Sequence, residues 1–276
     1  MKDRITIDIK DGIADVRMIR TDKMNALDDP MFDALIEAGQ TLAADTSIRC
    51  AVLSGEGRAF CAGIDLGRLA RRADQGEAAQ AQGKNIVNLM ERVHGISNRA
   101  QYAAMVWREL PVPVIAAVHG VAFGGGFQIM LGADFRYIHP ETKLAIMEAR
   151  WGLVPDMAGT LLLRGLMRED QIRELTYTAR VFSGAEAYDY GVATRITESP
   201  YEEAHETARQ IAGNSPSAIE AAKRMYNAWP MTPAEALQME SDEQVLLMGS
   251  PNQRETLKAH QEKRAPVFVN PRSRDQ

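Results

Sequence analysis

Two acidic residues could carry proton-transfer chemistry because they fall within a mainly apolar stretch, residues 147–160. Glu148 and Asp156 stand eight positions apart (156 minus 148) in that stretch. A carboxyl group beside apolar walls has a raised pKa and can exchange protons near neutral pH. Both carboxyl groups are therefore candidate general acids or bases.

Each of these carboxylates also has a structural explanation. Glu148 could form an ion pair with Arg150 or Arg164. Asp156 could instead cap a helix that begins at Met157, since an aspartate before an apolar helical stretch is a favoured N-cap. The sequence alone is compatible with the structural and the catalytic role of each carboxylate.

Two glycine-containing segments could present backbone N–H groups to a negatively charged oxygen. The first, residues 58–66, follows a short apolar strand, and its Gly63 permits a close approach of the backbone to a ligand. The second, residues 119–126, ends in a glycine triple between an apolar strand and an apolar helix, where free N–H groups point from the helix N-terminus. A tight turn and close packing are the structural alternatives. Nucleotide binding is disfavoured because neither G-x-G-x-x-G nor Gly-Lys-Ser/Thr is present.

The apolar pattern predicts strands that alternate with helices around these segments. Residues 5–9 and 14–18 alternate with polar residues on either side of Asp11-Gly12, which predicts a hairpin. Asp28 can cap a helix that follows it. Strands are further expected at residues 50–53, 114–118, 135–138 and 144–147, helices at 127–131 and in a long stretch ending near Leu110, and a polar loop or exposed helix at 67–85.

From Tyr201 onward the pattern is helical. We therefore expect an α/β fold with two parts. Residues 1–200 would form the core that holds the site, and residues 201–276 a helical C-terminal region.

The composition narrows the class of protein. The 276 residues carry a formal net charge of -5, which disfavours nucleic acids and anionic membranes as main partners. Two cysteines, Cys50 and Cys61, indicate no disulfide framework. No signal peptide or membrane-spanning run is evident, so we expect a cytoplasmic protein. The five histidines show no metal-binding pattern. A serine hydrolase is disfavoured because the sequence contains no Gly-x-Ser-x-Gly elbow.

The two glycine segments and the acidic pair, in this order and spacing, resemble the crotonase (enoyl-CoA hydratase/isomerase) superfamily. The segments 24–27, 179–193 and 215–223 are also similar to that family. The resemblance covers roughly residues 5 to 265. It implies a spiral of ββα units with a helical C-terminal region that packs in homotrimers, often as hexamers formed by two trimers. It also implies an acyl-CoA thioester substrate and no separate cofactor, because CoA is part of the substrate.

The resemblance further implies an oxyanion hole made of two backbone amides. In the family these belong to the residue between Gly and Asp of the A-G-x-D turn, here Ile64, and to the middle glycine of the triple, here Gly125. Such donors stabilise the enolate oxygen that forms when a proton is moved beside a thioester. Expected substrate-binding residues are Met24, Ala26, Ala62, Gly63, Asp65, Leu66, Arg68, Gly124 and Lys263.

The residues at the acidic positions differ between the hydratases and the isomerases of the family. A hydratase resembling the family type holds water with two glutamates, which align with Glu148 and with a position occupied here by Gln128. A Glu followed eight residues later by Asp resembles the dienoyl-CoA isomerases. We therefore expect Glu148 and Asp156 to act as acid and base, with Gln128 positioning water or the acyl chain. Hydration and double-bond isomerisation both remain open, as does acyl-CoA binding without turnover.

Overall fold

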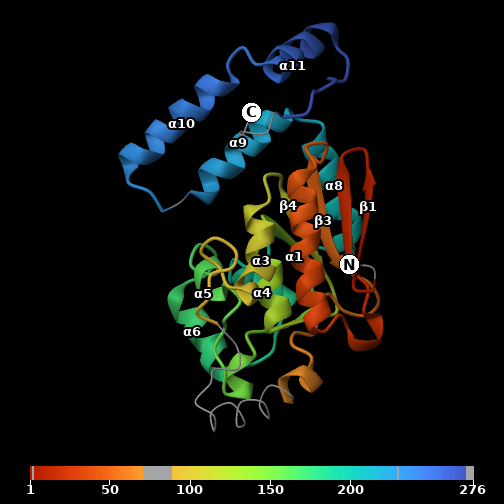
Figure 1. Cartoon of the computed structure of the whole chain (residues 1–276), viewed down its shortest axis with the longest axis vertical. Coiled ribbons are helices and arrows are strands. Elements are labelled where there is room, and N and C mark those ends of the chain that lie inside the picture. Colours follow the sequence, from red (N-terminus) through yellow and green to blue (C-terminus); the bar gives the residue numbers. More distant parts are fainter. Residues whose placement is uncertain (2, 71–88, 229, 272–276) are drawn as a thin grey trace.

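A computed structural model describes residues 1, 3–70, 89–228 and 230–271 (Figure 1). Its body contains a six-stranded sheet with the order β1-β2-β3-β4-β6-β9 and a three-stranded sheet with the order β5-β7-β8. This mixed α/β architecture confirms the predicted fold class.

The predicted hairpin is confirmed. β1 (Ile5–Lys10) and β2 (Ile13–Met18) pair in antiparallel register. The turn between them consists of Asp11 and Gly12, with φ angles of 53° and 77°. Positive φ angles at both turn residues suit the right-handed twist of the flanking strands, and Asp-Gly tolerates them.

The remaining strands of the six-stranded sheet run parallel to β2. They are β3 (Cys50–Gly55), β4 (Val114–Val118), β6 (Phe135–Ile138) and β9 (Arg195–Ile196). Strands covered on both faces are mainly apolar, and every residue of β3 and β4 is buried. Because parallel strands need crossover connections, helices cover the sheet on both sides.

Helices α1 (Asp29–Ala44) and α3 (Arg99–Glu109) pack together beside the main apolar core. Asp28 caps α1 by accepting a hydrogen bond from the amide of Met31, at 2.9 Å, as predicted. The long helix expected before Leu110 is wrong in extent, since α3 begins only at Arg99. Asn98 and Gln101 form a capping box there, which satisfies free amides and defines the helix start.

The second sheet carries the segments that matter for the site. β5 (Val121–Phe123) pairs in parallel with β7 (Lys143–Ala145), and β7 pairs with β8 (Phe182–Ser183). The helix α4 (Gly125–Leu131) follows β5 directly. The strand expected at residues 144–147 extends too far, because β7 ends at Ala145 and the 3-10 helix η2 (Glu148–Trp151) begins three residues later.

Further helices of the described residues lie in the body, besides the helical residues 66–70. They are α5 (Gly159–Leu162), α6 (Glu169–Thr178), α7 (Gly184–Asp189) and α8 (Pro200–Ala212), and a short 3-10 helix, η1 (Thr21–Lys23), precedes α1. The α8 helix packs on β2, β3, β4 and β6, where Ala204 and Ala208 join a second apolar cluster with Tyr137. The predicted boundary at residue 200 between the core and the C-terminal region stays a prediction. Because α8 packs on the sheet, we propose that the boundary lies after α8.

The C-terminal region extends away from the body (Figure 1). It consists of α9 (Pro216–Asn227), α10 (Pro233–Leu247) and α11 (Pro251–Glu262). Lys223 of α9 anchors the region, because its buried Nζ donates to Val112 O and to Asp134 Oδ2, both at 2.8 Å. Within the described residues, no helix has the length and apolar character needed to cross a bilayer.

Candidate active site

The first feature of the site is the orientation of the peptide group between Gly63 and Ile64. The amide of Leu27 donates to Gly63 O at 2.8 Å, and the amide of Asp65 donates to Leu27 O at 3.1 Å. A trans peptide directs its C=O and N–H in opposite directions. Since the Gly63 carbonyl points at Leu27, the Ile64 N–H points away from it.

The second feature is the start of α4. Gly124 O accepts a hydrogen bond from the Gln128 amide at 3.0 Å, so this carbonyl points along the helix. The N–H of Gly125 belongs to the same peptide and therefore points out of the helix N-terminus. This direction makes the Gly125 amide available to a ligand.

The two segments lie against one another. A Cβ placed on Gly63 would be 3.7 Å from Gly125 N and only 2.5 Å from Phe123 O, so the two backbones touch. Gly63 also has a φ angle of 86°. Only glycine meets both requirements without strain. The turn and the helix start are therefore neighbours, as the predicted oxyanion hole requires.

The carboxyl group of Glu148 lies beside this helix start. A Cβ placed on Gly124 would be 3.5 Å from Glu148 Oε1. The Glu148 residue is 9% exposed, and its Oε2 atom is buried without a hydrogen-bond partner. In the described part of the chain, its side chain hydrogen-bonds to Gln128 and forms no ion pair with Arg150 or Arg164, so the pairing alternative is wrong. A buried carboxyl group beside a helix start is a candidate functional group.

The Gln128 side chain holds Glu148 in place. Gln128 Nε2 donates to Glu148 Oε1 at 2.5 Å. Gln128 Oε1 accepts from the amides of Met157 and Gly159, each at 2.9 Å. These two donors fix the carboxamide orientation, because exchanging its oxygen and nitrogen would place donors against donors. Gln128 thus connects α4, η2 and the loop before α5.

Burial raises the pKa of Glu148 above its usual value. The negative charge of Asp156 raises this pKa further, whereas the hydrogen bond from Gln128 lowers it. The balance favours proton exchange closer to neutral pH than an ordinary glutamate allows.

The side chain of Asp156 is exposed and does not cap a helix. The α5 helix begins at Gly159, and its N-cap is Ala158, so the capping alternative is wrong. Asp156 is nevertheless close enough to Glu148 for its charge to affect the Glu148 pKa. It therefore lies at the open side of the site.

The other expected binding residues lie around the turn. Met24 O accepts from the Ala62 amide at 2.9 Å, and Leu66 is 56% exposed. Arg68 is buried against α1, where it pairs with Asp29 at 3.0 Å and its guanidinium lies 4.7 Å from the centre of the Phe32 ring. These contacts give Arg68 a structural role, and its contact with CoA stays a prediction. Much of the polar segment predicted at 67–85 lies outside the described residues, although residues 66–70 are helical.

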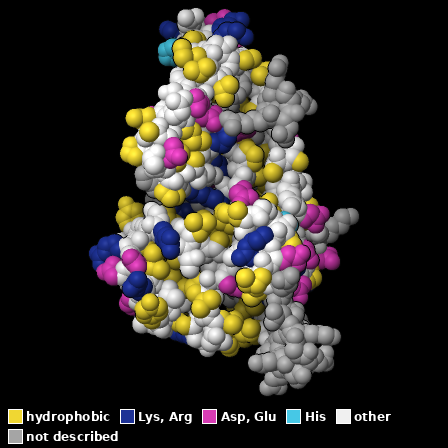
Figure 2. Space-filling model, turned by 60° about the vertical axis from the view of Figure 1, so that its left-hand side comes forward, with side chains coloured by type: hydrophobic (Ala, Val, Ile, Leu, Met, Phe, Trp, Pro, Cys, Tyr) yellow, Lys and Arg dark blue, Asp and Glu magenta, His cyan; other side chains and the backbone are white. Residues whose placement is uncertain are grey.

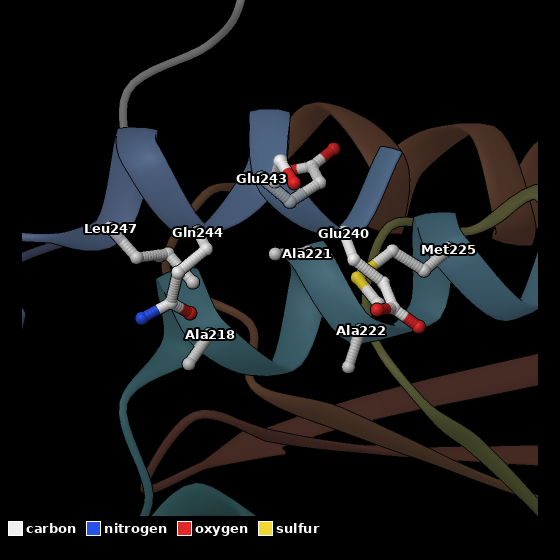
Figure 3. A pocket seen from close by; sticks show the side chains of 9 residues that line it. Ala218, Ala221, Ala222, Met225, Glu240, Glu243, Gln244 and Leu247 are labelled. Carbon is white, nitrogen blue, oxygen red and sulfur yellow. The ribbon is translucent and has the colours of Figure 1, made fainter. Parts of the chain in front are cut away.

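Lys263 lies apart from this group. It ends α11 with a φ angle of 53°, and its side chain is exposed. The α11 helix is at the opposite end of the molecule from α5 and α6 (Figure 1). A cavity of about 580 Å³ between α9 and α10 lies in the same distant region, lined by residues such as Ala221 and Gln244 (Figure 3).

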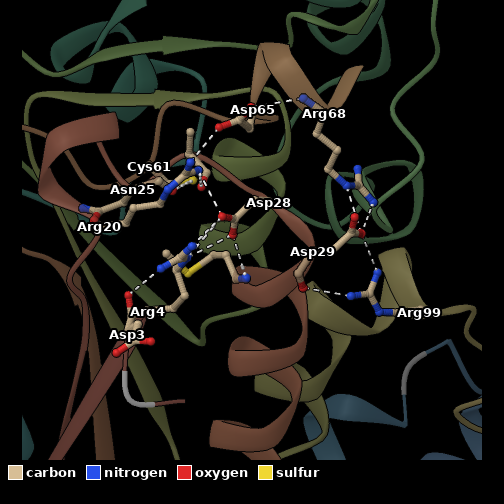
Figure 4. A network of polar contacts seen from close by, with 12 residues as sticks. Asp3, Arg4, Arg20, Asn25, Asp28, Asp29, Cys61, Asp65, Arg68 and Arg99 are labelled. Atoms are coloured by element: carbon tan, nitrogen blue, oxygen red, sulfur yellow. Dashed lines mark hydrogen bonds and ion pairs between the residues drawn. The ribbon is translucent and has the colours of Figure 1, made fainter. Parts of the chain in front are cut away.

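Our interpretation of the sequence missed Arg20. Its guanidinium donates to Ala26 O at 2.9 Å and to Asp65 Oδ2 at 2.8 Å, so it connects the segment before α1 with the glycine turn (Figure 4). The only available signal was a cation shortly before the motif at 24–27. In the described residues, no three His, Cys, Asp or Glu side chains gather in a way that could hold a metal ion.

The chain was compared with known proteins. The model of the family described as "Enoyl-CoA hydratase/isomerase" matches residues 8–271. A carnitinyl-CoA dehydratase of Salmonella typhi is 34% identical over 254 residues, which cover 89% of this chain and 91% of the relative. A protein of the same name from Proteus mirabilis is 34% identical over 209 residues, which cover 75% and 74% of the two chains.

Solved structures show the same architecture. The enoyl-CoA hydratase from Bacillus anthracis superposes with a TM-score of 0.84 and 26% identity over 97% of this chain and 100% of that chain. An enoyl-CoA hydratase from a Polaromonas species superposes with a TM-score of 0.82 and 27% identity over 96% and 99% of the two chains.

Proposed function

Because the chain belongs to the enoyl-CoA hydratase/isomerase family, we propose that it moves protons on an unsaturated acyl-CoA thioester. The amides of Ile64 and Gly125 would hold the thioester oxygen while it carries enolate charge. The observation that supports this most is the buried carboxyl group of Glu148, which lies beside the start of α4.

The amide arrangement supports an enolate rather than tight binding of the neutral thioester. Charge on the thioester oxygen grows as a proton is added to or removed from the adjacent carbon. Preorganised N–H donors stabilise that charge more than they stabilise the neutral carbonyl. Losing one such donor typically raises the barrier by about 3 kcal/mol.

We propose reversible hydration as the first reaction. In this step a water molecule gives its proton to Glu148 Oε2 and its oxygen bonds to the β-carbon, while the π electrons move onto the thioester oxygen. The resulting enolate then takes a proton from Glu148 at the α-carbon, which restores the carboxylate and the carbonyl. The reverse sequence removes water, and relatives named as dehydratases support this direction.

Double-bond isomerisation is the second candidate, and Gln128 favours it. A carboxamide cannot carry a proton, so Glu148 is the buried carboxyl group of the described site. One carboxylate suffices to take a proton from the γ-carbon and return it to the α-carbon. Incubation in isotopic water separates the reactions, because hydration incorporates oxygen whereas isomerisation moves the double bond without it.

Acyl-CoA binding without turnover is the alternative from another class. The buried carboxyl group of Glu148 beside the start of α4 argues against it, because burial raises its pKa and suits it to proton exchange, which a binding protein does not need. Tight binding of acyl-CoA with no reaction on any enoyl- or dienoyl-CoA would favour this alternative.

Substitution of the two carboxylates tests the proposal. Glu148→Gln should lower kcat by about 10²–10⁴-fold with little change in KM, because it removes the proton carrier and keeps the shape. Asp156→Asn should lower activity less, since Asp156 acts from the exposed side of the site. Glu141→Gln, at an exposed turn before β7, is the matched control. Full activity of both site variants on a panel of enoyl- and dienoyl-CoA thioesters would reject the assigned roles.

We also propose that the chain assembles into trimers or into hexamers of two trimers. Exposed apolar side chains on the C-terminal helices support this, including Leu246 and Met248, which are 65% and 68% exposed (Figure 2). Assembly would bring the distant Lys263 of one chain to the CoA phosphates bound by another. We further expect no separate cofactor and a cytoplasmic location.

A further inference from the structure

Arg20 lies where two segments of the site meet. Its side chain is only 15% exposed, and its Nη2 donates to Asp65 Oδ2 at 2.8 Å. Its Nη1 donates to Ala26 O at 2.9 Å and lies 3.5 Å from Asp28 Oδ2 (Figure 4). One guanidinium thus holds the glycine turn and the segment before α1 together.

A continuous series of hydrogen bonds leads from this guanidinium to the amide of Ile64. The Ala26 carbonyl, which accepts from Arg20, shares a peptide group with the Leu27 N–H. That N–H donates to Gly63 O at 2.8 Å. The Gly63 carbonyl in turn shares a peptide group with the Ile64 N–H, which points away from Leu27.

We propose that Arg20 positions and polarises the Ile64 amide through this relay of two peptide groups, so that it becomes a stronger donor to the enolate oxygen. The inference rests on the proposed function. A cation at the accepting end of aligned peptides draws electron density toward itself, and each hydrogen bond in such a chain strengthens the next by roughly 10–30%. The gain is largest in the transition state, where the thioester oxygen carries charge.

The fork geometry of arginine is needed for this role. The two terminal nitrogens donate to different acceptors, Ala26 O and Asp65 Oδ2. A lysine keeps the charge but presents a single ammonium, which cannot reproduce this planar fork. Arg20→Lys should therefore retain the fold and part of the polarisation, whereas Arg20→Met should retain the fold but lose both the charge and the fork.

Arg4 offers a matched control on the same cluster. It pairs with Asp28 at 2.8 Å, and its side chain is 23% exposed. Within the described residues it hydrogen-bonds to neither Ala26 nor Asp65. Arg4→Met thus removes a comparable partly buried ion pair of Asp28 and leaves the hydrogen bonds of Arg20 to Ala26 and Asp65 in place.

The test measures the thioester carbonyl of a bound, unreactive acyl-CoA by infrared difference spectroscopy. The probe is butyryl-CoA with an isotope label at the carbonyl carbon, and kcat and KM are measured on the matching enoyl-CoA. Wild-type protein and Arg4→Met should lower the carbonyl frequency equally. Arg20→Met should lower it less and should reduce kcat by about tenfold or more with little change in KM, and Arg20→Lys should be intermediate.

Two results would overturn the inference. One is a folded Arg20 variant whose carbonyl frequency and kcat equal those of the wild type. The other is an Arg4→Met protein that loses as much as Arg20→Met, because that would show a general effect of the ion-pair cluster. If wild-type protein shifts no carbonyl and turns over no thioester, the proposed function itself fails, and this inference fails with it.

Discussion

At the scale of single residues, the site combines one titratable side chain with backbone donors. Glu148 is held through Oε1 by Gln128, and its Oε2 is buried. This asymmetry assigns the reactive oxygen, because Oε1 already accepts a hydrogen bond from a group that cannot lose its proton. The remaining charge stabilisation comes from amides, which explains why the turn geometry matters more than the side chain at position 64.

The pH dependence of turnover should reveal the raised Glu148 pKa. For hydration Glu148 must be ionised, so the ascending limb of kcat/KM should lie above the pKa of an ordinary glutamate. Gln128→Met removes the hydrogen bond that lowers this pKa, and the limb should then move to still higher pH. If the ascending limb of kcat/KM lies at the pKa of an ordinary glutamate in both the wild type and Gln128→Met, the assignment of this limb to Glu148 is contradicted.

Glu148 should also reduce the stability of the fold at neutral pH. A carboxyl group whose pKa is raised in the folded state contributes stability below its unfolded pKa, about 4.3, and loses it as the pH rises through the folded value. Glu148→Gln should therefore raise Tm at pH 7 but give little gain below about pH 4. Thermal unfolding at the two pH values checks this, and Glu141→Gln serves as the control. If the Glu148→Gln protein has the wild-type Tm at neutral pH, the Glu148 carboxyl group does not have a raised pKa in the folded state.

At the scale of elements, the loop before α5 and the start of α4 behave as one unit. The amides of Met157 and Gly159 both converge on Gln128 Oε1, and Ala158 between them has a φ angle of 68°. A left-handed residue between two such donors forms the concave arrangement that usually holds an anion. Here the Gln128 carboxamide oxygen fills it, which fixes the distance between α4 and the loop before α5.

Gly159→Ala should disturb this unit without straining the backbone. A Cβ there would lie 2.7 Å from Gln128 Oε1, so the carboxamide must shift and release Glu148. We expect a loss in kcat of about tenfold, since small displacements at a catalytic group are costly. Gly165→Ala is the control, because a Cβ at Gly165 meets nothing within 4 Å. Equal activity of the two variants would show that the contact does not matter.

Residues close together in the sequence predicted the helices, strands and turns well. Contacts between elements that are distant in the sequence could not be predicted from it. The Asp11-Gly12 turn and the Asp28 cap were predicted because their partners lie within a few residues. The three residues of β5 were missed, since the strand is defined by pairing with β7, some twenty residues away. The support that Gln128 gives to Glu148 depends on a third segment, and no pattern in the sequence records it.

At the scale of the whole molecule, the helical C-terminal region stands outside the core and exposes apolar surface (Figures 1 and 2). Tyr226 is 77% exposed although it lies on an amphipathic helix. Surface of this kind is unusual in a monomer and typical of an interface between subunits. The anchoring of α9 by Lys223 keeps this region attached to the body while its outer face remains available.

Introducing charge on this outer face should reduce the assembly. Leu246→Glu combined with Met248→Glu would place two carboxylates in the proposed interface, where an unpaired charge is strongly unfavourable. Sedimentation should show three or six chains for the wild type and a smaller species for the variant. Ile9→Glu, at a side chain of an outer strand that is 46% exposed, should leave the mass unchanged. A monomeric wild type would remove the proposal.

The most direct test of the central claim is a crystal structure of the Glu148→Gln protein with a bound enoyl-CoA. We predict a thioester oxygen within hydrogen-bond distance, about 3.2 Å or less, of both Ile64 N and Gly125 N, with residue 148 facing the double bond. A carbonyl that contacts only one of these nitrogens, or that lies elsewhere in the fold, would contradict the account.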